Sequence, residues 1–211
     1  MIKAIMDLYE ELKERGLVYQ VSNEEGVKKL LNIKGGTFYF GFDPTAESLH
    51  VGSLLQIVTA KRLEENGLKP IVLVGGATGL IGDPSFKDKE RVLKQKEEVD
   101  NLVELLKRQL GRFFNFNKEA VFVNNLDWIE KVSYIDFARD VGKKFTVNEM
   151  IAKESVKERM KTGISFTEFS YMLLQSYDFL KIFEKYDCRM QMGGSDQWGN
   201  ITAGIELVRK T

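Results

Sequence analysis

Apolar and polar positions follow two different periods along the chain. Residues 1–36 carry apolar side chains at helical spacing, which predicts an N-terminal helical segment. The run TFYFGF at 37–42 is rich in aromatic residues and is followed by Asp43 and Pro44. This pattern predicts a short strand that ends at these two residues.

Strands and helices alternate through the middle of the chain. The continuous apolar runs at 69–76 and 119–125 are typical of strands covered on both faces of a parallel sheet. Apolar stripes at helical spacing, at 51–63 and 99–110, separate the strands. This alternation predicts an α/β fold, a Rossmann-like doubly wound parallel sheet.

The segment 127–165 departs from this alternation. It is more charged and shows no clear strand, so we expect a helical insertion that lies outside the sheet. A helix at 166–184, a strand at 188–192 and a helix at 198–210 then restore the pattern. No flexible linker divides the chain, and residues 1–211 are predicted to form one domain.

Composition narrows the classes of function. The 211 residues are 43% hydrophobic, and 31 Lys plus Arg balance 31 Asp plus Glu, so this segment offers no broad attraction to nucleic acid. Cys188 is the single cysteine, which excludes an internal disulfide and predicts a reducing, cytoplasmic setting. No His and Cys spacing predicts a metal site, and no run is apolar enough to span a membrane.

The single histidine, His50, stands in LHVGS at the start of the helix that follows the first strand. A helix N-terminus presents unpaired amide N–H groups that favour phosphate, and Gly52 permits close approach. The pattern permits a phosphate contact, whereas by itself it favours a histidine that caps the helix or is half-buried, with no ligand.

A glycine-rich loop, GGATGLIGDPSFKDKER at 75–91, follows the second strand. Its glycines permit positive φ angles and close approach of a ligand. Lys87 and Arg91 are four residues apart and would reach one phosphate chain together. The alternative is a surface loop with solvated charges, and the loop lacks the ending of a Walker A motif.

The helix predicted at 166–184 carries an unusual polar stripe. Tyr171, Gln175 and Asp178 are spaced i, i+4 and i+7, so they share one side of the helix. Solvent-exposed stripes usually carry Lys and Glu instead. The pattern favours a binding surface for a small polar ligand over simple exposure to solvent.

The segment MQMGGSDQWGNI repeats the arrangement of a strand, glycines and a helix start. Gly193 and Gly194 would let a ligand lie on the backbone, and Asp196 would accept hydrogen bonds from ribose hydroxyls. Helix capping by Ser195 or Asp196, without a ligand, is the alternative.

Four segments together, YFGFDPTAESLHVGS, VGGATGLIGDPSFKDKER, FTEFSYMLLQSYDFL and QMGGSDQWGNITAGIEL, resemble the successive signatures of the bacterial tyrosyl-tRNA synthetases. The resemblance spans essentially the whole chain and implies the nucleotide-binding catalytic domain of that family. It also implies that the chain is truncated before the lysine-rich KMSKS-type loop and the RNA-binding domains. Phe40 and Ser53 stand where the family commonly has other residues.

The resemblance implies roles for individual residues of this chain. For the substrate tyrosine, it assigns Tyr39 and Asp178 to the phenol hydroxyl. It assigns Asp83, Tyr171 and Gln175 to the ammonium, and Gln197 to the carboxylate. For ATP, it assigns the nucleotide to Gly41, Asp43, Gly52, Ser53, Gly194 and Asp196. As catalytic residues at the phosphates and the departing pyrophosphate, it assigns Thr45, His50, Lys87 and Arg91.

The implied reaction is in-line attack of the tyrosine carboxylate on the α-phosphorus of ATP, with Mg²⁺ bound to the phosphates. It yields tyrosyl-adenylate and pyrophosphate, and the full-length enzyme then transfers tyrosine to tRNA(Tyr). The attacking carboxylate is already ionised, so catalysis rests on positioning and charge stabilisation. The chain alone is expected to bind tyrosine but to activate it poorly.

The resemblance also implies a homodimer. We expect the insertion at 127–165 to form the interface, because it brings large apolar side chains together with charged ones. The proposed anchors are Trp128, Ile129, Phe137, Phe145 and Phe166. The alternative is that these side chains belong to the core of one chain.

Two other classes of function remain open. Another adenylyltransferase with a HIGH-type motif would share His50 and the sheet, but would have no need of Tyr39 with Asp178. A non-catalytic relative that binds tyrosine or scaffolds RNA would keep the fold and lose its phosphate-contacting residues. The presence of Thr45, His50, Lys87 and Arg91 favours the enzyme.

Overall fold

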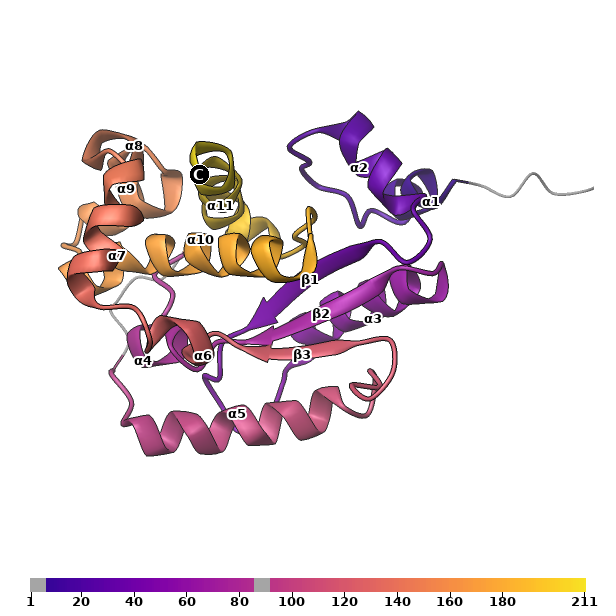
Figure 1. The fold of residues 1–211 in the computed structure, drawn as a ribbon, viewed down its shortest axis with the longest axis horizontal. Coiled ribbons are helices and arrows are strands. Elements are labelled where there is room, and N and C mark those ends of the chain that lie inside the picture. Colours follow the sequence, from indigo (N-terminus) through magenta and orange to yellow (C-terminus); the bar gives the residue numbers. More distant parts are fainter. Residues whose placement is uncertain (1–6, 86–91) are drawn as a thin grey trace, which may run out of the picture.

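The structure, a computed structural model, is built on a parallel sheet, and it describes residues 7–85 and 92–211 (Figure 1). The strands are β1 (Thr37–Phe42), β2 (Lys69–Val74) and β3 (Val121–Asn124), in the order β1-β2-β3. The α-helices are α1 (Leu8–Glu14), α2 (Glu24–Leu31), α3 (Val51–Glu65), α4 (Thr78–Ile81), α5 (Lys96–Leu110), α6 (Leu126–Ile129), α7 (Tyr134–Asp140), α8 (Val147–Ile151), α9 (Glu154–Met160), α10 (Phe166–Tyr186) and α11 (Trp198–Lys210). Two short 3-10 helices are η1 (Gly142–Lys144) and η2 (Ser195–Gln197).

Helices cover both faces of the sheet. Because side chains alternate along a strand, Phe38 and Phe40 of β1 point to one face and Tyr39 to the other. The first face packs against α3 and α5, and the second packs against α10 and α11 (Figure 1). This arrangement confirms the predicted doubly wound α/β fold. It also places Tyr39 opposite the polar stripe of α10.

The predicted strand at 188–192 is shorter than expected. The structure has one isolated parallel bridge there, between Tyr39 and Gln191. Asp187 ends α10 in a left-handed conformation, with φ of 48°, and Gly193 leads into η2, so little of this segment runs beside β1. The segment nevertheless lies on the side of β1 away from β2.

The N-terminal segment forms two short helices, α1 and α2. The side chains of Asp7 and Asn23 accept hydrogen bonds from backbone N–H groups in the first turns of α1 and α2. Leu8, Tyr9 and Leu12 of α1 join the core cluster on the α3 side of the sheet. This cluster ties the segment to the sheet.

The insertion consists of helices α6 to α9 and lies outside the sheet, as predicted (Figure 1). A buried ion pair fixes it to α10: the guanidinium of Arg159 binds both carboxylate oxygens of Glu168, at 2.9 and 2.8 Å. Their side chains are 5% and 2% exposed, so removing one partner would leave a buried charge, at a cost of about 3–5 kcal/mol.

Candidate functional site

A cavity of about 560 Å³ opens at the carboxyl end of β1. The chain passes from β1 to β2 and β3 on one side, and returns to the other side of β1 at Gln191. Ligands of open α/β sheets bind at such a reversal of strand order. The predicted site residues that the structure describes all line this cavity: Tyr39, Gly41, Asp43, Thr45, His50, Gly52, Ser53, Asp83, Tyr171, Gln175, Asp178, Gly194, Asp196 and Gln197.

The deep end of the cavity carries the side chains of Tyr39 and Asp178, each 2% exposed. One carboxylate oxygen of Asp178 accepts a hydrogen bond of 2.8 Å from the indole N–H of Trp128. The other accepts one of 3.0 Å from the side-chain amide of Asn125. The hydroxyl of Tyr39 is buried and has no hydrogen-bond partner in the part of the chain that the structure describes. It is therefore free to bond a ligand.

Burial dominates the acid-base properties of this end. It raises the pKa of Asp178 to about 8, against the opposing effect of the hydrogen bonds from Asn125 and Trp128. Burial, followed by the charge of Asp178, raises the pKa of Tyr39 well above its ordinary value. Tyr39 is therefore a neutral hydrogen-bond donor, whereas Asp178 titrates within the working range of an enzyme.

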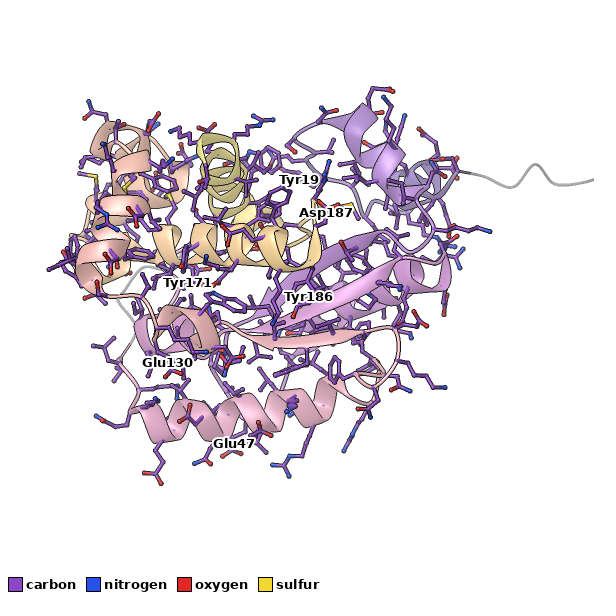
Figure 2. The ribbon with its side chains drawn as sticks, in the orientation of Figure 1. Tyr19, Glu47, Glu130, Tyr171, Tyr186 and Asp187 are labelled. Atoms are coloured by element: carbon purple, nitrogen blue, oxygen red, sulfur yellow. The ribbon has the colours of Figure 1, made fainter. Side chains whose placement is uncertain are left out.

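The polar stripe of α10 is buried against the sheet. Tyr171 lies on the side of the helix that faces the strands and α4 (Figure 2), and its hydroxyl donates a 2.8 Å hydrogen bond to Asp43. The amide oxygen Oε1 of Gln175 is buried and has no hydrogen-bond partner within residues 7–85 and 92–211. A cationic donor placed beside Tyr171 would satisfy this oxygen.

Gln197 is already engaged. Its amide nitrogen donates to Oδ2 of Asp83 at 2.7 Å and to Asp196 at 2.9 Å, and its oxygen accepts from Asn200 at 3.1 Å. A carboxylate ligand at Gln197 would therefore have to replace one of these acceptors. Asp83 also accepts a hydrogen bond from the backbone N–H of Ser85 in the same loop. The hydrogen bond between Asp83 and Gln197 therefore joins the glycine loop to the start of α11.

His50 forms the N-cap of α3. Its Nδ1 accepts a 3.0 Å hydrogen bond from the backbone N–H of Gly52, and a Cβ at Gly52 would lie 2.8 Å from the imidazole ring. Capping and a contact with phosphate are compatible. A neutral imidazole that accepts at Nδ1 carries its proton at Nε2, and this N–H remains as a donor for a phosphate oxygen. Ser53, one residue further, is buried and also lines the cavity.

Neither Ser195 nor Asp196 caps the last helix, α11, with its side chain. These residues form the 3-10 turn η2, and α11 starts at Trp198 with no side-chain hydrogen bond at its N-cap. The simple capping alternative is therefore wrong. A Cβ at Gly194 would lie 2.3 Å from Oδ1 of Asp196, so a side chain there would displace the exposed Asp196 carboxylate.

The glycines of the loop also serve packing within the chain. Of its glycines, Gly82 has a positive φ, of 89°, whereas Gly75, Gly76 and Gly79 do not. A Cβ at each of these three would collide with side-chain atoms of the protein itself, so they permit close packing within the chain. Lys87 and Arg91 lie outside the described residues, and their contacts to phosphate stay a prediction.

Two polar residues of the site escaped the sequence analysis. Asn125 and Thr78 lie at the carboxyl ends of β3 and β2, and their side chains bond each other and the carboxylates of the cavity. The carboxyl ends of parallel strands meet at one edge of the sheet, and this signal identifies Asn125. Phe40, in contrast, is fully buried in the core on the α3 side and does not line the cavity.

Within residues 7–85 and 92–211, no group of three or more His, Cys, Asp and Glu side chains is arranged to hold a metal ion. In the same ranges, no helix has the length and apolar character needed to cross a membrane.

The fold defines a Rossmann-like α/β domain with a cavity at the carboxyl end of its parallel sheet, and comparison with known proteins gives the family. Residues 34–211 match the model of the tRNA synthetases class I (W and Y), so the chain belongs to that family. The chain is 59% identical to a tyrosine–tRNA ligase of Bacillus caldotenax over 98% of its own length. It is 58% identical, over 96%, to tyrosine–tRNA ligase 2 of Enterococcus faecalis.

The chain spans about half the length of these curated relatives, 50% and 49%. Among solved structures, it is similar to a C-terminally truncated mitochondrial tyrosyl-tRNA synthetase of Aspergillus nidulans. The TM-score is 0.84 at 31% identity, and the match covers 96% of this chain and 61% of the other. A tyrosyl-tRNA synthetase of Archaeoglobus fulgidus, at 19% identity with a TM-score of 0.72, shares the fold.

Proposed function

We propose that this chain holds the tyrosine and ATP sites of a tyrosine–tRNA ligase. The tyrosine carboxylate attacks the α-phosphorus of ATP, the bond to the bridging oxygen of pyrophosphate breaks, and tyrosyl-adenylate forms. In the full-length protein the tyrosyl group then passes to tRNA(Tyr). The membership in the synthetase family supports this reaction, and so do the relatives that are tyrosine–tRNA ligases.

The observation that carries the proposal is the pairing of Tyr39 with Asp178 at the buried end of the cavity. A phenol hydroxyl placed there accepts from Tyr39, whose own hydroxyl has no partner in the described structure, and donates to Asp178. Phenylalanine would leave both groups unpaired and out of water, which costs about 1–3 kcal/mol for each group. The pocket therefore selects for a phenol.

The ammonium of tyrosine fits the middle of the cavity. Oε1 of Gln175 is unpartnered there, and the hydroxyl oxygen of Tyr171 keeps an acceptor position after it donates to Asp43. Asp83 supplies a carboxylate that lines the same space. These acceptors turn the carboxylate of tyrosine toward the nucleotide end, where Gln197 is proposed to bind it.

The nucleotide end is formed by the start of α3 and by the glycine pair before η2. Gly41, Asp43, Gly52, Ser53, Gly194 and Asp196 are proposed to hold ATP. Thr45 and His50 are proposed to contact its phosphates, with Nε2–H of His50 as donor, and Lys87 and Arg91 to stabilise the departing pyrophosphate. Mg²⁺ would be carried by the ATP phosphates, whose oxygens are the ligands it prefers.

A homodimer is also proposed, with a revised set of anchors. Trp128, Phe137 and Phe145 are partly buried and pack against hydrophobic clusters of this chain. Ile129 is only partly exposed. Phe166 is 70% exposed, and Tyr134 and Ile135 of the insertion are 72% and 75% exposed. These three offer apolar surface to a second copy.

The test compares ligands in a calorimeter. Tyrosine should bind, and phenylalanine should bind at least about 30-fold more weakly, which corresponds to roughly 2 kcal/mol. Exchange of pyrophosphate into ATP should depend on tyrosine, which separates this reaction from that of another adenylyltransferase. Equal binding of both amino acids would contradict the proposal.

A cytoplasmic location, proposed from the unpaired Cys188, is checked by cell fractionation.

Residues 1–211 alone are proposed to bind tyrosine and to activate it poorly. Each proposed tyrosine contact lies between Tyr39 and Gln197, whereas the KMSKS-type loop implied by the resemblance lies outside these residues. Contacts that form only in the transition state raise the rate without affecting ground-state binding. The full-length protein should therefore match this segment in tyrosine affinity and exceed it in adenylate formation.

A further inference from the structure

The hydroxyl of Thr78 lies between the two ends of the cavity. It donates a 2.7 Å hydrogen bond to Oδ1 of Asp43 and accepts one of 3.0 Å from the side-chain amide of Asn125. The same amide nitrogen donates to Oδ2 of Asp178 at 3.0 Å. A continuous path of hydrogen bonds therefore joins the carboxylate at the phenol end to the carboxylate at the nucleotide end.

The side chains of Thr78 and Asn125, which form this path, are buried and hydrogen-bonded. Thr78 is 2% exposed and Asn125 is 0% exposed. Oδ1 of Asn125 accepts from the backbone N–H of Ala77 at 2.7 Å, so both ends of its amide are occupied. A buried polar group without a partner is costly, and this fixes one orientation of the amide, with an N–H directed at Asp178.

The backbone of the glycine loop is shaped around the Thr78 hydroxyl. A Cβ at Gly75 would lie 2.1 Å from Oγ1 of Thr78 and 2.2 Å from Oδ1 of Asp43. A Cβ at Gly76 would lie 2.3 Å from Oδ1 of Asn124, the neighbour of Asn125. Gly75 therefore leaves the space in which the hydroxyl meets the carboxylate, and Gly76 leaves the space for the Asn124 side chain.

The path also supplies one hydrogen-bond donor to each carboxylate. Thr78 donates to Asp43, and Asn125 donates to Asp178. Donors of this kind favour the ionised form of a carboxyl group and fix the direction of its lone pairs. Both carboxylates are thereby held in place as acceptors for donors of a ligand.

We propose that Thr78 is a positioning residue for tyrosine activation. Through Asn125 it fixes Oδ2 of Asp178 at the phenol end, and directly it fixes Oδ1 of Asp43 at the nucleotide end. This inference rests on the proposed function. Loss of the hydroxyl loosens both carboxylates together, so the affinity for tyrosine and the rate with ATP fall together.

The experiment compares Thr78→Val, Thr78→Ala and Thr78→Ser in the full-length protein. Thr59→Val is the matched control, because the Thr59 hydroxyl donates to the Leu55 carbonyl within α3, away from the path. The tyrosine Kd is measured by calorimetry, kcat and the KM for ATP by pyrophosphate exchange, and folding by thermal melting. Thr78→Ala removes the hydroxyl without placing a methyl group against the carboxylate, should the valine fail to fold.

We expect Thr78→Val and Thr78→Ala to weaken tyrosine binding roughly tenfold and to lower kcat, with Thr78→Ser within about twofold of wild type. In an Asp178→Asn background, the effect of Thr78→Val on tyrosine affinity should largely disappear, because the two residues act on one contact. The control should change neither quantity.

Other outcomes overturn the inference in distinguishable ways. If Thr78→Val and Thr78→Ala lower the melting temperature but leave affinity and rate unchanged, Thr78 is a packing residue. If their effect on affinity is additive with Asp178→Asn, the path carries no coupling. If the wild-type protein binds no tyrosine at all, the proposed function has failed, and this inference with it.

Discussion

The hydroxyl of Tyr171 donates a 2.8 Å hydrogen bond to Oδ2 of Asp43, although 128 residues separate the two in sequence. Tyr171 belongs to α10, and Asp43 follows β1. The bond therefore fixes the polar stripe of α10 over the carboxyl end of the strand. In the proposed reaction, this places the amino-acid pocket beside the nucleotide pocket, as in-line attack requires.

Asp178→Ala should weaken tyrosine binding by at least about 2 kcal/mol, roughly 30-fold in Kd. The variant removes the acceptor of the phenol hydroxyl and also leaves the donors of Asn125 and Trp128 without their partner. Asp127→Ala, at an exposed position near the site, is the control and should bind as wild type does. Unchanged affinity in Asp178→Ala would rule out this phenol pocket.

His50→Ala should slow activation in the full-length protein and leave tyrosine affinity intact, because His50 is proposed to act on the ATP phosphates. The variant also loses the N-cap of α3, at a cost of about 1 kcal/mol of stability. His50→Asn separates the two effects, since Asn retains an acceptor for the backbone N–H of Gly52 and lacks Nε2. It should recover stability and not rate. A loss of tyrosine binding in a folded His50 variant would contradict this role.

The sequence predicted the elements of the fold well because each rests on a local pattern. Strand β1, for example, follows from its aromatic run and from the Asp43-Pro44 that ends it. The length of the strand predicted at 188–192 was overestimated. This length depends on Asp187 and Gly193, where the chain enters and leaves the edge of the sheet. The local spacing of apolar residues does not predict the direction in which the chain leaves the sheet.

The site was predicted where one helix or one strand end holds several polar residues, as with Tyr171, Gln175 and Asp178. Thr78 and Asn125 were missed because their partners are 35 to 53 residues away. Only the tertiary structure brings these side chains together. The role of the glycines in packing was not predicted, because a missing Cβ makes room for a ligand and for a neighbouring side chain equally well.

Phe166→Asp should weaken self-association of the full-length protein. Phe166 exposes 70% of its surface at the start of α10, and a charge at the centre of an apolar interface would have to be buried without a partner. Tyr19→Asp is the control, because Tyr19 is 80% exposed on the loop between α1 and α2. Sedimentation at micromolar concentration should show a dimer for the wild type and the control. A wild-type monomer would count against the proposed interface.

Tyrosine binding should strengthen as the pH rises toward 8, because the phenol donates to an ionised Asp178. Burial raises the pKa of Asp178 to about 8 in the ligand-free protein, so below that pH tyrosine must displace a proton from the carboxyl group. The affinity should therefore rise about tenfold per pH unit between roughly pH 6 and 7.5. Calorimetry in buffers of different ionisation enthalpy should detect the released proton, and Asp178→Asn should abolish both effects.

The same pKa acts on stability with the opposite sign. The folded pKa of about 8 lies above the ordinary value of 3.8, so the proton on Asp178 favours the folded state fully below about pH 4, and this contribution is lost as the pH rises to 8. The free energy of unfolding of the ligand-free wild type, relative to Asp178→Asn, should therefore fall between pH 5 and 8, approximately the window between the two pKa values. Urea titrations of the two proteins across this range measure the difference. A difference that stays constant with pH would show that Asp178 is ionised throughout, and tyrosine would then bind without releasing a proton.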